Sequence, residues 1–121
     1  MDSEKRKYLR FECTLPAEVT RIEEQNGLVE KARIDDFSRE GMKMVLNVEF
    51  NFTPGSVIEL QCALPGKQAT ASVSAEVVWS RNEGDKCVLG LRIKEMAAEA
   101  RSEILGSCYE EWQKKKSTPK E

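Results

Sequence analysis

The chain of 121 residues contains no histidine at all. Histidine is the commonest general base in enzymes and completes every Ser-His and Cys-His nucleophile pair, so its absence removes these forms of catalysis. Carboxylates remain, but no pair of Asp or Glu side chains stands apart from the general scatter of charge along the sequence. We therefore expect a protein that is not an enzyme.

Cysteine is present but is not arranged for metal binding. The four cysteines are far apart and form no Cys-x-x-Cys pair: Cys13, Cys62, Cys87 and Cys108. A zinc site would have to gather all four thiolates from distant segments of the chain. Because each cysteine lies in an apolar context, we expect small buried thiols in a reducing compartment, and no bound metal.

Long apolar runs are also missing, and no stretch approaches the length of a membrane span. The first ten residues, MDSEKRKYLR, are charged and lack the hydrophobic segment of a secretory signal. Apolar residues make up 40% of the chain and charged residues 33%, which is ordinary for one soluble domain of this length. We expect a single cytoplasmic domain without membrane insertion.

Across residues 11–93 apolar positions mostly alternate with polar ones, which is the pattern of half-buried β-strands. Turn signals divide this region, among them an Asn-Gly pair at 26–27 and a Pro-Gly pair at 54–55. About six short strands result, which predicts a small antiparallel barrel or sandwich. The alternation places Val77 and Trp79 on the same inward face.

The pattern changes after Glu95, where apolar residues recur three or four apart, as on one face of a helix. The predicted face consists of Ala97, Ala100, Ile104, Cys108 and Trp112. We expect Trp79 and Trp112 to lie in the core or to cap the barrel. The last residues, KSTPKE, should fray.

The N-terminal stretch gathers cations, although the chain has a net charge of −2. Arg6 and Arg10 are four residues apart, so an extended chain places both guanidinium groups on one side. The guanidinium fork matches phosphate, reads the O6/N7 edge of guanine and stacks on aromatic bases. Two readings are open: a solvated tail, or a flexible arm that awaits an anionic ligand.

A second polar motif, DFSREG at residues 36–41, lies between two predicted strands. As a simple turn, its Asp and Ser would bond nearby backbone and Gly41 would take a positive φ. In a functional reading, Asp36 and Ser38 present oxygen atoms at one lip of the barrel. Gly41 would then let the chain turn sharply or let a ligand come close.

Taken together, Arg-x-x-x-Arg before the first strand and Asp-x-Ser-x-x-Gly about 25 residues later resemble the PilZ domain. The hairpin AEVVWSRNEGDKCVLGLRI and the closing helix extend the resemblance to nearly the whole chain. It implies a mainly β fold: a six-stranded antiparallel PilZ-type β-barrel with a C-terminal α-helix. The expected parts are a flexible N-terminal arm at 1–10, the barrel at 11–95, the helix at 96–116 and a frayed tail at 117–121.

PilZ domains are receptors for cyclic di-GMP, a bacterial second messenger, and the resemblance implies a role for each motif residue. Arg6 and Arg10 would grip the phosphates and the guanine Hoogsteen edges. Asp36 and Ser38 would bond a guanine and a phosphate from the barrel side, and Gly41 would keep the turn. Two nearby cations would add positive charge: Lys5 and Arg39.

The resemblance therefore implies a cytoplasmic cyclic di-GMP receptor in motility or biofilm regulation, without a cofactor. Because the sequence holds no output domain, we expect it to signal to an unidentified effector protein through ordering of its N-terminal arm. The alternative is a PilZ-like protein-interaction module of a motility or assembly system that binds no nucleotide. A nucleic-acid binder fits poorly, because no broad basic stripe with interleaved aromatics is present.

Overall fold

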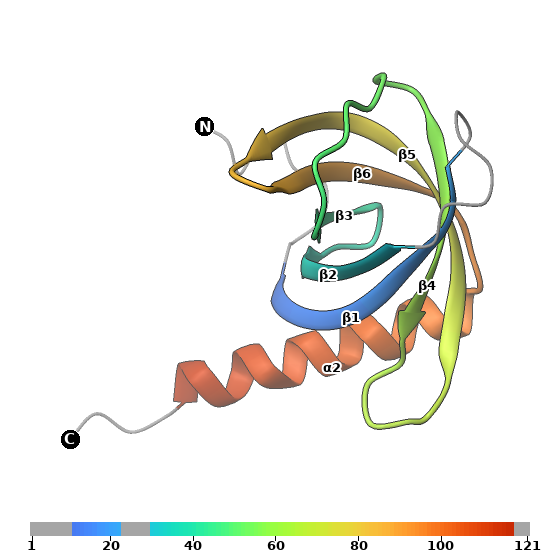
Figure 1. The fold of residues 1–121 in the computed structure, drawn as a ribbon. Coiled ribbons are helices and arrows are strands. Elements are labelled where there is room, and N and C mark those ends of the chain that lie inside the picture. The colour runs from blue at the N-terminus through green and yellow to red at the C-terminus, as the bar shows by residue number, and fades with distance from the viewer. Residues whose placement is uncertain (1–10, 23–29, 118–121) are drawn as a thin grey trace, which may run out of the picture.

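The computed structural model describes residues 11–22 and 30–117. Six antiparallel strands close into a barrel in the order β1-β2-β3-β6-β5-β4, and one helix lies against it (Figure 1). The elements are β1 (Phe11–Ile22), β2 (Glu30–Phe37), β3 (Gly41–Leu46), β4 (Val57–Ala63), β5 (Thr70–Glu83), β6 (Lys86–Met96) and α2 (Ala98–Ser117). The predicted six-stranded antiparallel barrel with a C-terminal helix is confirmed.

The core fills the inside of the barrel, and every strand contributes inward-facing apolar side chains to it. On β4 the alternation is regular, and Ile58, Leu60 and Cys62 are almost completely buried. Met42 and Met44 of β3 are fully buried in the same way, as their spacing indicates. Burying one large aliphatic side chain contributes about 1.5–3 kcal/mol to folding, so these rows supply much of the stability.

A β-bulge in β2 decides which way its polar residues face. The pairing with β3 shifts register between Ile34 and Asp36, which leaves Asp35 as the extra residue. Ile34 and Phe37 are three apart and yet both fully buried. Strict alternation cannot place both inside the barrel, but one extra residue can. The bulge thereby keeps Asp35 and Asp36 on the outside, both partly exposed.

A second bulge, in β5 between Val77 and Trp79, turns Trp79 to the outside of the barrel, so the prediction that it faces inward was wrong. Val77 is buried, whereas Trp79 is 39% exposed on the outer face and does not belong to the core. Its indole lies over Gly90 of β6, where a Cβ would come within 2.2 Å of the indole Nε1. The guanidinium of Arg81 lies 5.2 Å from the centroid of the same ring.

Helix α2 packs along β1 and extends beyond the barrel toward its C-terminal end (Figure 1). Three of the predicted apolar positions are buried: Ala100, Ile104 and Cys108. The prediction was wrong at both ends of this face. Ala97 is exposed just before the helix begins, and Trp112, one turn after the buried Cys108, is 41% exposed. No helix in the described part of the chain combines the length and apolarity needed to cross a bilayer.

Candidate functional site

The first described strand, β1, begins beside the barrel residues that were predicted to bind the ligand. The three cations Lys5, Arg6 and Arg10 lie outside the described residues. Strand β1 begins at Phe11, whose Cα partner on β2 is Phe37. Arg10 directly precedes Phe11, and consecutive Cα atoms are only about 3.8 Å apart. The covalent chain therefore ties Arg10 to the strand position that lies between Asp36 and Ser38.

Ser38 closes the turn between β2 and β3. Its Oγ accepts a hydrogen bond from the backbone N–H of Gly41 at 3.1 Å and lies 3.2 Å from the Gly41 carbonyl oxygen, to which it donates. The backbone N–H of Ser38 donates to the same carbonyl at 2.8 Å. Because Ser38 is only 4% exposed, these bonds are sheltered from water. The hydroxyl thus has a structural role in fixing the turn.

The turn is shorter than the motif suggested, and Gly41 does not use a positive φ. Asp36 still belongs to β2, which ends at Phe37, and Gly41 is the first residue of β3. Among the described glycines, those with a positive φ are Gly55, Gly66 and Gly84. Gly41 instead pairs with Arg92 of β6, and the neighbouring Glu40 carbonyl accepts a bond from the Ile93 N–H at 2.8 Å.

Cross-strand pairing builds an outer patch next to this turn. Asp36 pairs with Lys43, and Lys43 pairs with Gly90. Gly90 pairs in turn with the outward-facing Trp79. With neighbouring strands about 4.8 Å apart, this row of four strands spans roughly 14 Å. The outer patch comprises Asp36, Gly41, Lys43, Trp79, Gly90 and Arg92.

The outer patch contains cations that the motifs did not indicate. Arg92 is exposed and forms an ion pair with Glu76 of β5. The hydrogen bond from Arg92 lowers the pKa of Glu76 and raises that of Arg92, so both stay charged at neutral pH. Arg39, which the motif analysis already named, is exposed in the turn. Lys43, which it did not name, is partly exposed beside Asp36. Lys43 alternates with the two buried methionines of β3, and this spacing could have identified it as outward-facing.

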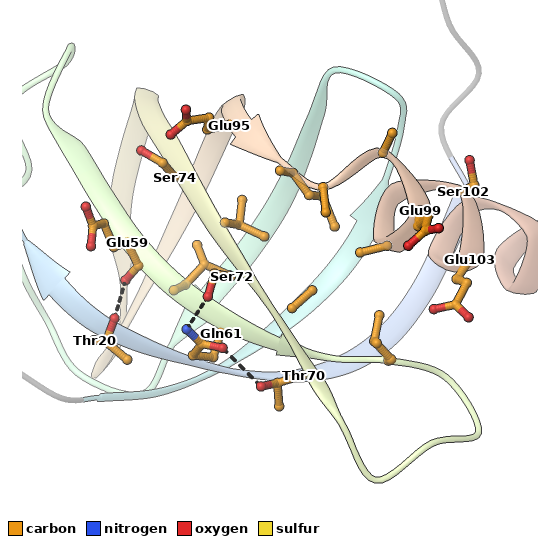
Figure 2. Close-up of a pocket in the computed structure, with 18 of the residues that line it drawn as sticks. Thr20, Glu59, Gln61, Thr70, Ser72, Ser74, Glu95, Glu99, Ser102 and Glu103 are labelled. Atoms are coloured by element: carbon orange, nitrogen blue, oxygen red, sulfur yellow. Dashed lines mark hydrogen bonds between the residues drawn. The ribbon is translucent and has the colours of Figure 1, made fainter.

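A larger hollow lies elsewhere on the surface and has the wrong charge for a phosphate ligand. It measures about 1360 Å³ and lies between β4, β5 and the start of α2 (Figure 2). Its carboxylates come from Glu59, Glu95, Glu99 and Glu103. Its Lys67 is already paired with Glu103. None of the described residues of the predicted site lines this hollow, so we do not assign ligand binding to it.

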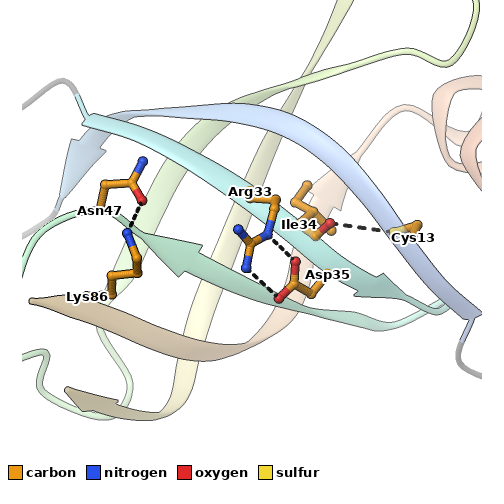
Figure 3. Close-up of polar contacts among 6 residues, drawn as sticks. All are labelled: Cys13, Arg33, Ile34, Asp35, Asn47 and Lys86. Carbon is orange, nitrogen blue, oxygen red and sulfur yellow. Dashed lines mark hydrogen bonds and ion pairs between the residues drawn. The ribbon is translucent and has the colours of Figure 1, made fainter. Parts of the chain in front are cut away.

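A smaller hollow of about 690 Å³ adjoins the outer patch, since Asp36 and Lys43 both line it. Asp35 also lines it, and the Arg33 guanidinium holds the Asp35 carboxylate with bonds of 2.6 and 3.2 Å (Figure 3). Helix α2 closes the other side with Cys108. Among the described residues, no group of three or more Cys, Asp or Glu side chains is arranged to hold a metal ion.

Ser38→Ala should destabilise the free protein, because it removes the acceptor of the Gly41 N–H inside a buried turn. A buried donor left without a partner costs about 1–3 kcal/mol of unfolding free energy. Urea denaturation measures this loss. Ser102→Ala is the control, because that serine is exposed on α2 and its removal should change stability by less than about 0.5 kcal/mol. Equal stability of the two variants would show that the turn does not depend on the Ser38 hydroxyl.

Comparison with solved structures finds the same fold in bacterial proteins. The inhibitor of motility MotI/DgrA of Bacillus subtilis is 23% identical with a TM-score of 0.74, covering 92% of this chain and 52% of that one. The PilZ domain of Escherichia coli YcgR, solved with c-di-GMP, is 15% identical with a TM-score of 0.69, covering 95% and 99%. A larger YcgR structure in complex with c-di-GMP is 17% identical with a TM-score of 0.69, covering 92% and 49%.

The chain thus spans about half the length of MotI/DgrA and of the larger YcgR. A comparison with curated protein sequences gives no match. The family model of the PilZ domain, however, matches residues 4–110, which include both sequence motifs and all six strands. Together with the closed barrel and its C-terminal helix, this match shows that the chain belongs to the PilZ domain family.

Proposed function

We propose that this protein is a receptor for cyclic di-GMP that acts without catalysis, binding the ligand between its N-terminal arginines and the outer patch. The observation that carries the proposal is the pairing of Phe11 with Phe37, which ties the Arg-x-x-x-Arg segment to the turn that holds Asp36 and Ser38. Membership of the PilZ family supports it, and so does the presence of c-di-GMP in two of the similar structures.

The N-terminal arginines and the barrel residues together have the chemistry to bind a ligand with two phosphates and two guanines. Arg6 and Arg10 supply guanidinium forks for phosphate oxygens and for the O6/N7 edge of guanine. From the barrel side, the Asp36 carboxylate accepts hydrogen bonds from a guanine amino group. Lys43 adds positive charge near the phosphates, whereas Arg92 is held in its ion pair with Glu76.

Cyclic di-GMP should bind at least tenfold more tightly than cyclic di-AMP. Adenine offers an N6 amino donor where guanine offers the O6 acceptor, so an arginine fork aimed at guanine meets a donor. Each lost bidentate pair costs about 1–3 kcal/mol of discrimination. Competition titration with cyclic di-AMP, GTP and GMP measures the preference. Equal affinity for the two cyclic dinucleotides would contradict guanine readout by these arginines.

We further propose that ligand binding orders the N-terminal arm over the barrel. Cyclic di-GMP would bridge Arg6 and Arg10 on the arm to Asp36 and the turn closed by Ser38 on the barrel, which is an order–disorder switch driven by ligand charge. Amide exchange at residues 4–10 should slow when ligand is added, with smaller changes at residues 36–41. Exchange at 4–10 that is already slow without ligand and unchanged by it would contradict the switch but not the binding.

The ordered arm would form a new surface for an effector protein. A partner that recognises this surface binds more tightly when ligand is present. Linkage then requires the partner to raise the affinity for cyclic di-GMP by the same factor. The receptor would act in the bacterial cytoplasm, in motility or biofilm regulation, and its four free cysteines suit that reducing compartment.

A second candidate is a protein-interaction module of a motility or assembly system that binds no nucleotide. The exposed aromatic pair of α2 favours it. The ring centroids of Tyr109 and Trp112 are 5.7 Å apart, and the two side chains are 45% and 41% exposed. Exposed aromatic residues are enriched where proteins meet one another. A folded chain that shows no saturable binding of cyclic di-GMP would favour this candidate.

A further inference from the structure

Two cysteines that are far apart in the sequence meet where α2 packs on the barrel. Cys13 lies near the start of β1, and Cys108 lies on the last buried turn of α2. Each thiol is the largest single influence on the pKa of the other. Both line the smaller hollow. Cys13 is partly exposed and Cys108 is 4% exposed.

The two thiols are not equivalent. The Cys13 thiol lowers the pKa of Cys108, against the opposing effects of burial and of Glu111. The Cys108 thiol raises the pKa of Cys13, and burial raises it further. Cys13 also makes a long 3.8 Å contact to the Ile34 carbonyl (Figure 3). The lowered pKa makes Cys108 the more readily ionised thiol of the two.

The other two cysteines lack these features. Cys62 and Cys87 are both fully buried in the core. Burial raises the pKa of Cys62 to about 11 and also raises that of Cys87. Thiols of this kind are chemically inert, because the thiolate is the reactive form and it is disfavoured in apolar surroundings. They provide internal controls within the same chain.

We propose that Cys13 and Cys108 form a reversible disulfide when the protein meets a hydroperoxide. The Cys108 thiolate attacks the peroxide O–O bond, forms a sulfenic acid and releases the alkoxide or hydroxide, which takes up a proton. The Cys13 sulfur then attacks the sulfenic sulfur, the S–S bond forms, and the hydroxyl group leaves as water with the Cys13 proton. In total, two thiols lose two hydrogen atoms, and one hydroperoxide is reduced to one alcohol and one water, or to two waters when it is hydrogen peroxide.

The disulfide would link Cys108, at the end of the buried face of α2, to Cys13 in β1, the strand that follows Arg10. Among the helix residues whose burial is described, Cys108 is the last buried one, and Tyr109 to Lys114 beyond it are exposed. Cys13 is three residues after Arg10. Asp36 lines the same hollow as both sulfurs. The cross-link is therefore an oxidation site beside the proposed ligand site, but it does not depend on nucleotide binding.

The test is peptide mapping of the full chain after treatment with hydrogen peroxide and alkylation of the remaining thiols. Trypsin places each cysteine in a separate peptide, namely residues 11–21, 44–67, 87–92 and 102–114. We expect peptides 11–21 and 102–114 to be joined, with a mass two hydrogens below their sum. Peptides 44–67 and 87–92 should carry the alkylating group in full. Dithiothreitol should restore all four thiols.

Two variants separate the roles of the sulfurs. In Cys13→Ser the sulfenic acid on Cys108 has no partner, so dimedone should label peptide 102–114. In Cys108→Ser neither a cross-link nor label on Cys13 should form. The proposal is overturned if Cys13 and Cys108 remain fully alkylated after peroxide. It is equally overturned if Cys108 is oxidised to sulfinic acid while Cys13 stays a thiol, or if the cross-links join separate molecules.

Discussion

Arg10→Ala should weaken cyclic di-GMP binding by about 2–5 kcal/mol and leave the thermal stability of the free protein nearly unchanged. Removal of one partner from a hydrogen-bonded charge pair leaves the ligand phosphate or guanine edge without its donor. The loss corresponds to an affinity between about 30-fold and several thousand-fold lower. Titration calorimetry and a melting curve measure the two quantities on one preparation. Arg6→Ala should behave in the same way.

Arg21→Ala is the matched control for this prediction. Arg21 lies near the far end of β1, where its exposed guanidinium is 3.7 Å from the Glu59 carboxylate. The variant therefore changes net charge by the same amount without touching the proposed site. If Arg21→Ala weakened binding as much as Arg10→Ala, only overall charge would matter. If Arg10→Ala unfolded the domain, the arginine would be structural and the proposed clamp would fail.

Phe37→Ala should lower the free energy of unfolding by about 3–5 kcal/mol. Phe37 is fully buried and is among the largest side chains of the core, so its truncation leaves a cavity inside the barrel. It also anchors the end of β2 between Asp36 and Ser38, so the remaining folded protein should bind cyclic di-GMP more weakly. Chemical denaturation measures the stability, and titration in the absence of denaturant measures the binding.

Val78→Ala provides the comparison for this variant. Val78 is 53% exposed on the outside of β5, and its truncation should cost little because the side chain is already in water. A Phe37→Ala variant as stable as Val78→Ala would show that the end of β2 does not depend on packing inside the barrel.

The sequence predicts the barrel because regular alternation on strands such as β4 is compatible with few folds other than a small antiparallel barrel or sandwich. It does not predict the direction of Trp79, because strict alternation assumes that no residue is inserted into the ladder. The bulge in β2 did leave a signal, since Ile34 and Phe37 are both large and apolar but three residues apart. A spacing of three in a strand pattern indicates a bulge, and here the bulge directs Asp36 outward.

The sequence motifs named residues of the proposed site but not the neighbours that the barrel brings beside them. Lys43 and Arg92 reach the outer patch through pairing of β2 with β3 and of β3 with β6. The second of these pairings joins segments far apart in the chain, and a single sequence does not reveal which strands become neighbours. For the same reason the approach of Cys13 to Cys108 was not expected. Helical spacing gave the buried face of α2, but it could not indicate where the barrel beneath it ends.

Titration calorimetry of the full chain with cyclic di-GMP tests the central claim most directly. We expect a saturable isotherm for the unaltered protein, and the same isotherm for Arg21→Ala. We expect a loss of at least 30-fold in affinity for Arg10→Ala, which corresponds to about 2 kcal/mol. Absence of saturable binding by a chain whose melting curve shows a folded domain would contradict the account, and the protein would then be an interaction module rather than a nucleotide receptor.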